Sequence, residues 1–285
     1  MRIAVVVLAV FASACTSADV LRVDLTPRAE VIGQGVPVLL DEPKEPYQTI
    51  ALVEVAVDSV ISARRAVELG ADRLELCQAL EVGGLTPSLG LVGAVRAAVG
   101  VPLFIMIRPR PGAFEWGAAD TEVMLRDIGL VRELGADGVV GGALTAVGEI
   151  DLEVTEQLVA RAGSMPFTFH RAFDLVADWR SGLAQLRALG ARRVLTAGGR
   201  GTAFEGRARL AEYVAQAVGG PIVVAGGGIR AATVGQLLAG TGLREIHLAG
   251  VVSVPEEQTG FGQTSLPDEV RVKAVIEAIG GPLGT

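Results

Sequence analysis

The sequence predicts a single (β/α)8 barrel of the TIM-barrel type, beginning at residue 50, and three observations favour this α/β fold class. From residue 50 onward, short runs of branched apolar residues alternate with helical stretches, as in successive βα units of a parallel sheet. The chain has 285 residues, 37 of them Gly, and is 50% hydrophobic but only 4% aromatic, which suits an aliphatic sheet covered by helices. A glycine also recurs shortly before several of the runs, where a helix would end.

Eight strands are expected, each followed by a helical stretch. The recurring glycines precede the second, fourth, sixth and eighth runs, and as helix C-terminal caps they would adopt positive φ. A last helix, Asp268–Ile279, closes the ring after a loop at Ser253–Pro267. An open, doubly wound sheet is the alternative, but eight successive units with right-handed crossovers favour the barrel. The predicted strands are Ala51–Val57, Arg73–Cys77, Leu103–Ile107, Gly138–Leu144, Phe167–Arg171, Arg193–Gly198, Ile222–Gly226 and Glu245–Ala249.

The segment before the barrel divides into two parts. Residues 1–18 have the layout of a secretory signal, with one Arg, an apolar run at Ile3–Phe11 and small residues before Cys15 that resemble a lipoprotein cleavage site. The run is too short to span a bilayer, and a short buried strand or helix is the alternative interpretation. Residues 19–49 contain several prolines and no sustained periodicity, so we expect a linker or small appendage before the barrel at 50–285.

Composition excludes several classes of function. The formal charge is -7 and no Lys/Arg cluster is interleaved with aromatic residues, so no nucleic-acid surface is expected. The two cysteines, Cys15 and Cys77, do not form a CxxC or Cys/His spacing, which argues against a zinc or redox motif and against a disulfide framework. No other segment of the sequence is a transmembrane candidate.

In a (β/α)8 barrel, polar residues at the C-terminal ends of the strands are the candidates for function. On the second strand, Arg73, Glu75 and Cys77 share one face, because side chains along a strand alternate between its two faces with a period of two residues. An Arg and a Glu facing the barrel interior are costly to bury unless they are paired or used. Because Arg73 lies near the start of its strand, a structural salt bridge is an equally good interpretation for it.

Two arginines follow the third strand. Arg108 and Arg110 lie in "IRPR" on either side of a proline and would share a face. Guanidinium groups converging above the barrel would form an anion site, because their fork geometry suits carboxylate or phosphate oxygens. Two solvated loop arginines are the alternative.

The fifth strand ends in "FTFHRAFD", which places His170 at the strand end with Arg171 and Asp174 close behind it. A histidine at this location is suited to general acid/base chemistry near neutral pH, and Asp174 could orient its ring. The chain has only two histidines, and the other, His247, also lies near a strand end, preceded on its face by Glu245. We therefore favour function over a structural core histidine.

Glycine-rich turns follow the sixth and seventh strands. The sixth ends with Thr196, Gly198 and Gly199, and the seventh with Gly227 and Gly228. Glycines here would let backbone N–H groups approach a phosphate, and barrels often bind phosphate near strands seven and eight. Plain tight turns are the alternative.

Seven motifs together resemble the CutC family: "VEVAVDS", "GADRLELC", "GGLTPS", "IRPR", "TFHRAFD", "RVLTAGG" and "EIH", in the family's order over Ile50–Ala249. The resemblance implies a TIM barrel, a link to copper homeostasis, a cytoplasmic protein and no settled enzymatic activity. Carried onto the matching positions, it implies a site lined by Glu54, Arg73, Glu75, Arg108, Arg110, His170, Arg171 and Asp174.

Two departures from the family pattern stand out. Residues 1–49 lie outside it, so a cytoplasmic location conflicts with a signal-like segment that would export the protein or anchor it to lipid. Ala113 stands where an acidic residue is expected. Copper is implied by the resemblance alone: Cu(I) prefers thiolate and thioether ligands, and the barrel offers Cys77 with Met106, Met124 and Met165. Cys77 as a small buried hydrophobic residue is the favoured alternative.

Three hypotheses follow. The first is a CutC-like protein of copper homeostasis with an anion pocket at the barrel mouth. The second is an enzyme, of isomerase, lyase or hydrolase type, in which His170 and Glu75 exchange protons with a small phosphorylated or carboxylated metabolite held by Arg108 and Arg110. The third is a protein that binds copper through Cys77. The first two assume that Glu75, Arg108, Arg110 and His170 meet at one mouth; the sequence leaves homo-oligomerisation open.

Overall fold

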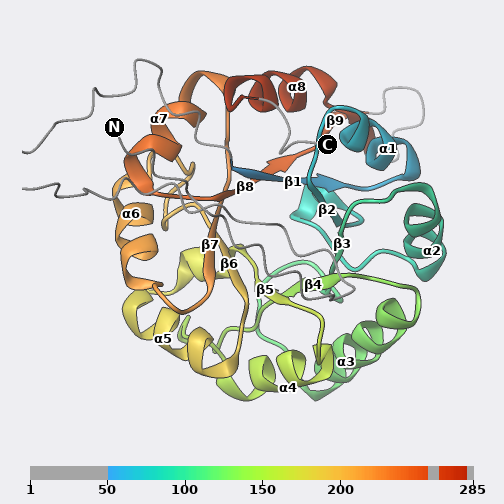
Figure 1. Cartoon of the computed structure of the whole chain (residues 1–285). Helices are drawn as coiled ribbons and strands as arrows, with labels where there is room; N and C mark the ends of the chain where they lie inside the picture. The colour runs from blue at the N-terminus through green and yellow to red at the C-terminus, as the bar shows by residue number, and fades with distance from the viewer. Residues whose placement is uncertain (1–50, 256–262, 281–285) are drawn as a thin grey trace, which may run out of the picture. The chain divides into compact units, whose positions relative to one another are not determined.

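Eight parallel strands close into a barrel in which every strand pairs with its neighbour in sequence and β8 pairs with β1. The computed structural model describes residues 51–255 and 263–280. Helices surround the strands (Figure 1). The barrel prediction is therefore confirmed, and the doubly wound alternative is wrong. The strands are β1 Leu52–Val57, β2 Arg73–Leu76, β3 Leu103–Met106, β4 Gly138–Gly141, β5 Phe167–Phe169, β6 Arg193–Thr196, β7 Ile222–Gly226 and β8 Glu245–Ala249.

The main helices alternate with the strands, and several of them begin or end where the sequence supplies a cap. Side chains of Asp151, Asp178 and Asp268 each accept a backbone N–H in the first turn of the helix that follows. The predicted glycine caps are confirmed: Gly70, Gly135, Gly190 and Gly242 have φ of 101°, 83°, 82° and 72°. The helices are α1 Val60–Glu68, α2 Leu89–Ala98, α3 Ala118–Glu133, α4 Leu152–Ala162, α5 Trp179–Leu189, α6 Arg207–Gln216, α7 Ala231–Thr241 and α8 Glu269–Ala278, with short 3-10 turns η1 Leu80–Val82 and η2 Arg171–Leu175.

Three strands end two or three residues earlier than predicted, all at the face where the candidate residues lie. β4 stops at Gly141, β5 at Phe169 and β6 at Thr196. After β5 the chain turns at once, because His170 is the N-cap of η2, and after β6 Gly198 takes a φ of 73° that leaves the strand region. The polar residues at these ends therefore belong to loops, where the period of two no longer fixes their direction.

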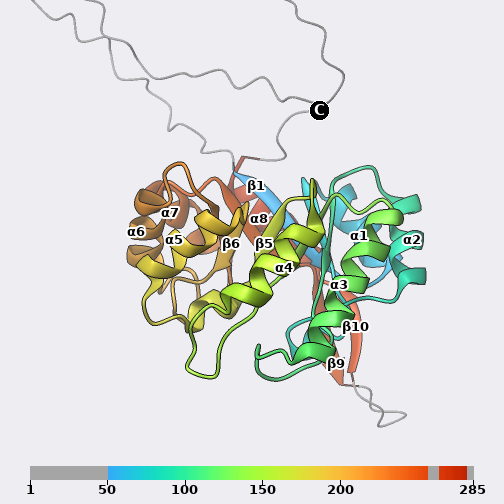
Figure 2. The same ribbon diagram turned by 90° about the horizontal axis from the view of Figure 1, so that it is seen from below.

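The predicted loop before the last helix is partly wrong. Residues Val251–Pro255 (β9) and Gln263–Pro267 (β10) pair as a two-stranded antiparallel sheet, and β10 lies beside α1. The two strands run together away from the barrel (Figure 2). β-branched residues in "VVSVP" suit paired strands, a signal that the Gly- and Thr-containing surroundings obscured.

Alternation along the strands separates an apolar core from a polar barrel interior. Val53, Val55 and Val57 of β1 join the large apolar core that the helices cover, whereas Glu54 and Ala56 lie on the opposite face. A second, small apolar cluster inside the barrel contains Cys77, Phe104, Met106 and Val140. Charged side chains of β1, β2, β6 and β8 also lie in the interior, where they contact one another.

The predictions for residues 1–18 and 19–49 lie outside the described residues. Among the described helices, none is both long and apolar enough to cross a membrane.

Candidate active site

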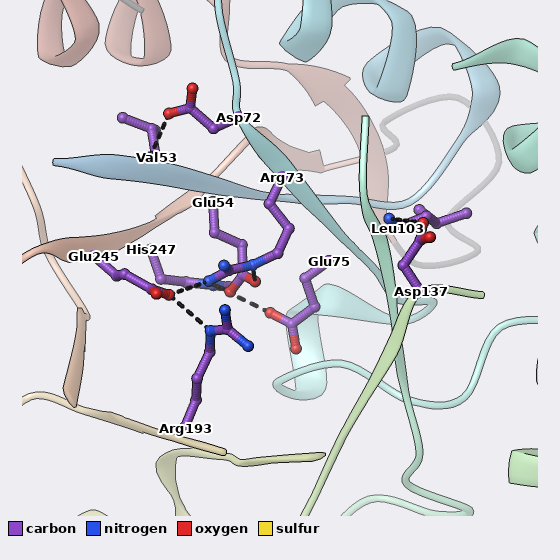
Figure 3. A network of polar contacts seen from close by, with 10 residues as sticks. All are labelled: Val53, Glu54, Asp72, Arg73, Glu75, Leu103, Asp137, Arg193, Glu245 and His247. Atoms are coloured by element: carbon purple, nitrogen blue, oxygen red, sulfur yellow. Dashed lines mark hydrogen bonds and ion pairs between the residues drawn. The ribbon is translucent and has the colours of Figure 1, made fainter. Parts of the chain in front are cut away.

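A buried network of ion pairs occupies the barrel interior (Figure 3). The register of β1 with β2 and β8 places Glu54 beside Arg73 on one side and His247 on the other. Arg73 donates from Nε to Glu54 and from Nη2 to Glu245 at 2.7 Å, and Arg193 of β6 donates to the same Glu245 oxygen at 2.8 Å. Glu54 and Arg73 are each only 2% exposed. The contacts of Arg73 therefore match the salt-bridge interpretation. Its side chain lies below the mouth of the barrel.

Glu75 and His247 form the upper part of this network. His247 Nδ1 lies 2.8 Å from Glu54 Oε1 and 3.3 Å from Glu75 Oε2. The three side chains of Glu54, Glu75 and His247 come from neighbouring strands. One carboxylate oxygen or ring nitrogen of each lies within 4.8 Å of those of the other two, close enough to act together as metal ligands. Glu75 Oε1 is buried without a hydrogen-bond partner among the described residues.

The surroundings of Glu54 and Glu75 shift the pKa values of these two carboxyl groups in opposite directions. Burial alone would raise the pKa of Glu54, but the charge of Arg73 and the hydrogen bond from His247 lower it to about 2. Burial raises the pKa of Glu75 to about 7, although the charge of His247 opposes the rise. Burial works against the charged form of His247, yet Glu75 and Glu54 outweigh it and raise the pKa of this histidine. Because each of these two groups shifts the pKa of the other, the protonation of Glu75 and that of His247 are linked.

A pH-dependent stability follows from the raised pKa of Glu75. Between pH 4.5 and 6.5 the folded protein keeps the Glu75 proton, whereas the unfolded chain releases it, so stability falls as the pH rises. At about 1.4 kcal/mol per unit, the fall over this window is up to about 3 kcal/mol. Glu54, with a pKa near 2, contributes to the pH dependence only below this window, and His247 only above it. His170, whose pKa burial lowers to about 3, changes the stability in the opposite direction over this window, and it does so in both proteins. Urea denaturation at pH 5, 5.75 and 6.5 should therefore show the stability of the wild type falling relative to that of Glu75→Gln as the pH rises. Parallel pH profiles of the two proteins would contradict the assignment.

A cavity of about 290 Å³ opens above the pair, at the C-terminal ends of the strands. Its floor includes Glu75 and His247, and its walls come from the loops after β2, β3, β5 and β7 and from α8. The lining is Ala56, Glu75, Cys77, Leu80, Gly83, Met106, Phe114, His170, Arg171, Leu195, Gly227, Gly228, Ile229, His247, Leu248, Ala249 and Arg271. Polar groups are few and converge on a largely apolar cavity, which is the usual form of a small-molecule site.

His170 lies in the wall of this cavity, but not as predicted beside Asp174. Its Nδ1 accepts the backbone N–H of Ala172 at 3.4 Å, and its ring packs on Phe114 with centroids 4.7 Å apart. Nε2 is buried without a partner among the described residues. Burial, helped by the charge of Arg108, lowers the pKa of His170 to about 3. His170 is therefore neutral at physiological pH and unsuited to the predicted role of a base that titrates near 7.

Asp174 supports the loop after β6 instead of orienting His170. Its carboxylate accepts hydrogen bonds from the Thr196 hydroxyl, from the backbone N–H of Ala197 at 2.9 Å and from that of Gly199 at 3.0 Å. It also pairs with Arg171 at 2.9 Å. The predicted role is corrected because η2 turns the chain between positions 170 and 174, so that the two side chains face different groups.

The predicted glycines fall into two groups: those that form the turn after β6 and those that line the cavity. Gly198 lies against Gly206, whose carbonyl oxygen would be 2.6 Å from an added Cβ, so the turn after β6 is a tight structural one. Thr196 and Gly199 bind Asp174, and Gly198 donates its N–H to the Thr196 hydroxyl at 2.9 Å. None of these three residues lines the cavity. Gly227 and Gly228, in contrast, do line it.

The predicted convergence of Arg108 and Arg110 does not occur. The Arg108 guanidinium is buried and donates to the carbonyl oxygens of Val82, Gly84 and Gly112 at 2.8, 3.0 and 3.0 Å, which ties the loops after β2 and β3 together. Arg110 pairs with Asp120 at 2.9 Å and lines a separate surface groove, which includes Ala113. Because β3 ends at Met106, these arginines lie in a loop, and the period of two that placed them on one face does not apply.

Three contributors to the site were missed. Arg271 of α8 and Phe114 line the cavity, and Arg193 completes the ion network. Arg73, Arg193 and Glu245 are the first residues of their strands β2, β6 and β8. Residues of opposite charge at the same level of a barrel can pair, so the sequence did contain a signal for the role of Arg193. For Arg271, which α8 brings back to the mouth from the end of the chain, the sequence offered none.

Fold and site together define a class: a (β/α)8-barrel protein with a pocket of ionisable side chains at the C-terminal ends of its strands. The chain belongs to the CutC family, whose family model matches residues 51–252. It is 46% identical over 208 residues to a family protein CutC of Xylella fastidiosa strain Temecula1, covering 73% of this chain and 78% of that protein. It is also 46% identical over 196 residues to the human copper homeostasis protein cutC homolog, covering 69% and 72%.

Solved structures give the same fold. A CutC protein of Streptococcus agalactiae matches with a TM-score of 0.67 at 31% identity, covering 70% of this chain and 98% of that one. A phosphonomutase-like protein of Burkholderia cenocepacia matches with a TM-score of 0.53 at 16% identity, covering 71% and 89%, a likeness of fold alone.

Proposed function

We propose that the cavity binds a small organic anion and that Glu75 and His247 exchange a proton with it, making the protein an acid/base enzyme. The observation that carries this proposal is the pair itself: two buried ionisable groups 3.3 Å apart in the cavity floor, with a pKa of about 7 for Glu75. Perturbed groups in a cleft are typical of catalytic sites, because proton transfer is most efficient when the pKa lies near the working pH.

The anion-binding part of the proposal rests on part of the cavity wall. Arg171, Arg271, Gly227 and Gly228 all line the cavity. The Arg171 guanidinium lies so close to Gly227 that a Cβ there would be 3.0 Å from Nη1. A carboxylate or phosphate at this wall would meet guanidinium and backbone donors together. These groups take the place of Arg108 and Arg110 as the proposed anion clamp.

Calorimetry with oxalate tests the proposal, because oxalate is small, doubly charged and does not itself titrate near neutral pH. A bound anion raises the pKa of the Glu75–His247 pair, so binding at pH 7 should take up protons. Heats measured in two buffers of different ionisation enthalpy report that uptake. We expect uptake by the wild type and a smaller uptake by Glu75→Gln, in which only His247 of the pair can still take up a proton. Oxalate binding with equal heats in the two buffers would contradict the proton-exchange role.

Arg171→Gln is expected to weaken oxalate binding by about tenfold to a hundredfold, since hydrogen bonds to charged groups contribute roughly 1.5–3 kcal/mol. Arg126→Gln is the matched control, because Arg126 is an exposed residue of α3 paired only with Glu122. The same calorimetric titration measures both variants. Equal affinities of the two variants would exclude Arg171 from the anion site.

Copper fits the donor groups of the cavity poorly. Cys77 and Met106 lie side by side, since a Cβ on Gly84 would be 3.2 Å from the Cys77 sulfur and 3.5 Å from Met106 Cε. However, burial and the nearby Glu75 carboxylate raise the pKa of the Cys77 thiol well above its usual range, which disfavours the thiolate that Cu(I) requires. The buried hydrophobic interpretation of Cys77 agrees with its 1% exposure.

The carboxylate and imidazole donors beside the thiol also fit a metal poorly. Glu54 is already bound by Arg73 and His247, so an ion there would replace both interactions next to a guanidinium group. The copper homeostasis named in relatives thus does not identify a copper site in this cavity.

Cu(I) titration against a chromophoric chelator checks this conclusion. We expect Cys77→Ser and the wild type to retain equal amounts of Cu(I), because the Cys77 thiol stays protonated. Comparing the two proteins isolates Cys77 from Cys15, which both retain. A stoichiometric loss of Cu(I) in Cys77→Ser would contradict the expectation and establish a copper site in the barrel.

A further inference from the structure

We propose that His170 is a fixed, uncharged hydrogen-bond donor that stabilises an oxyanion opposite Glu75, and that the substrates are small carbonyl compounds bearing a carboxylate or phosphate. This inference rests on the proposed function and specifies its chemistry. It arises from two buried polar atoms with no partner among the described residues, His170 Nε2 and Glu75 Oε1, on side chains that line the same cavity.

The tautomer of His170 follows from its contacts. Nδ1 accepts the N–H of Ala172, the second residue of η2, so in the neutral ring the proton is on Nε2. The ring is held by Phe114 at 4.7 Å and Phe169 at 5.8 Å between centroids. The Arg108 guanidinium lies 5.0 Å from the centre of the Phe114 ring, and its charge opposes protonation of His170. Ala172, Phe114 and Arg108 are thus positioning residues for one N–H.

An unpartnered donor and an unpartnered acceptor in one apolar cavity are costly. Each buried polar group without a hydrogen bond has lost its contact with water and gained no partner in exchange. A ligand that presents an acceptor to His170 and a proton to Glu75 removes both costs at once. A carbonyl with a neighbouring C–H has this pair of groups on adjacent atoms, and its carboxylate or phosphate would reach Arg171.

The step balances without any oxidant or co-reactant. The Glu75 carboxylate takes the proton from the carbon next to the carbonyl, and the electron pair of the C–H bond forms a C=C bond. The carbonyl π electrons move to oxygen, where the His170 N–H donates a hydrogen bond to the resulting enolate. Return of the proton from Glu75 restores the compound, and in D2O it returns a deuteron. The protein should therefore exchange this hydrogen with solvent.

The experiment incubates the full chain in D2O at pD 7.5 with two sets of compounds, 2-oxo acids and phosphorylated ketoses or aldoses, and follows the C–H signal by proton NMR. We expect exchange in at least one set. The set that exchanges shows whether the substrate carries a carboxylate or a phosphate. His170→Ala should slow it by about 10²–10³, the effect of losing one oxyanion donor. His170→Gln, whose amide N–H reaches a similar position, should recover part of the rate.

A spectroscopic readout keeps the test independent of folding in the variants. The chain has only two histidines, so ¹⁵N-histidine labelling gives two imidazole spectra, assigned by His247→Gln. We expect His170 to remain the neutral Nε2–H tautomer from pH 8 to pH 5 and its Nε2 resonance to shift on addition of oxalate. A cationic ring or an Nδ1–H tautomer would overturn the inference.

The two proposals fail differently. Exchange that is lost in Glu75→Gln but unchanged in His170→Ala overturns the role of His170 and leaves the acid/base pair standing. Exchange that survives in Glu75→Gln overturns the proposed function and this inference with it. Absence of exchange in both sets overturns the substrate class, while the oxalate calorimetry still decides on the proton-exchange pair.

Discussion

Arg73→Met is expected to lower the free energy of unfolding by about 3–5 kcal/mol, the cost of breaking a buried ion pair by removing one partner. Arg73 binds both Glu54 and Glu245 inside the barrel, where its side chain is 3% exposed. The apolar replacement would leave Glu54 without its guanidinium partner and Glu245 with Arg193 alone. Urea denaturation at pH 7 measures the change.

Arg126→Met is the control for this experiment. The Arg126–Glu122 pair lies on the surface of α3, with side chains 73% and 63% exposed. Exposed pairs of this kind contribute about 0–1 kcal/mol, so the control should unfold almost as the wild type does. Similar losses in the two variants would show that the Arg73 network does not stabilise the barrel in the way its geometry indicates.

Glu75→Gln is expected to slow hydrogen exchange of the bound compound by about 10²–10⁴, the usual contribution of a general base. Glutamine keeps the size of the side chain and removes only the group that accepts the proton. The rate is measured in D2O on whichever compound the wild type exchanges. Because the introduced glutamine carries no charge, His247 also loses part of the interaction that keeps it protonated.

Glu81→Gln supplies the matched control, since Glu81 is an exposed residue of η1 on the loop that follows the same strand. Its exchange rate should equal that of the wild type. A Glu75→Gln protein that folds normally and retains the full rate would remove Glu75 from the mechanism.

Regular periodicity made the fold and the floor of the site predictable from the sequence. All eight strands were identified because each is a short apolar run between helical segments, and glycine caps marked the starts of β2, β4, β6 and β8. Glu75 and His247 lie at strand positions where the period of two holds, so their direction into the barrel followed from the sequence. The CutC resemblance also pointed to Glu75, but His247 was not among the residues that it implied.

The walls of the site could not be predicted in the same way, because loops set them. Arg110 turns outward to Asp120, and Asp174 binds backbone groups after β6, although both residues are close in sequence to strand ends. Arg271 reaches the mouth only because α8 completes the ring. The sequence correctly indicated that charged residues would lie near these strand ends. Which of them come together depends on loop geometry, which no local sequence pattern encodes.

The most direct test of the shared proton is ¹³C NMR of glutamate carboxyl groups between pH 4 and pH 9, with the Glu75 signal assigned by its absence in Glu75→Gln. We expect this carboxyl to titrate near pH 7 and its titration to change when His247 is replaced by Gln. A Glu75 midpoint near the ordinary value of 4.5, independent of His247, would contradict the acid/base site at the centre of this account.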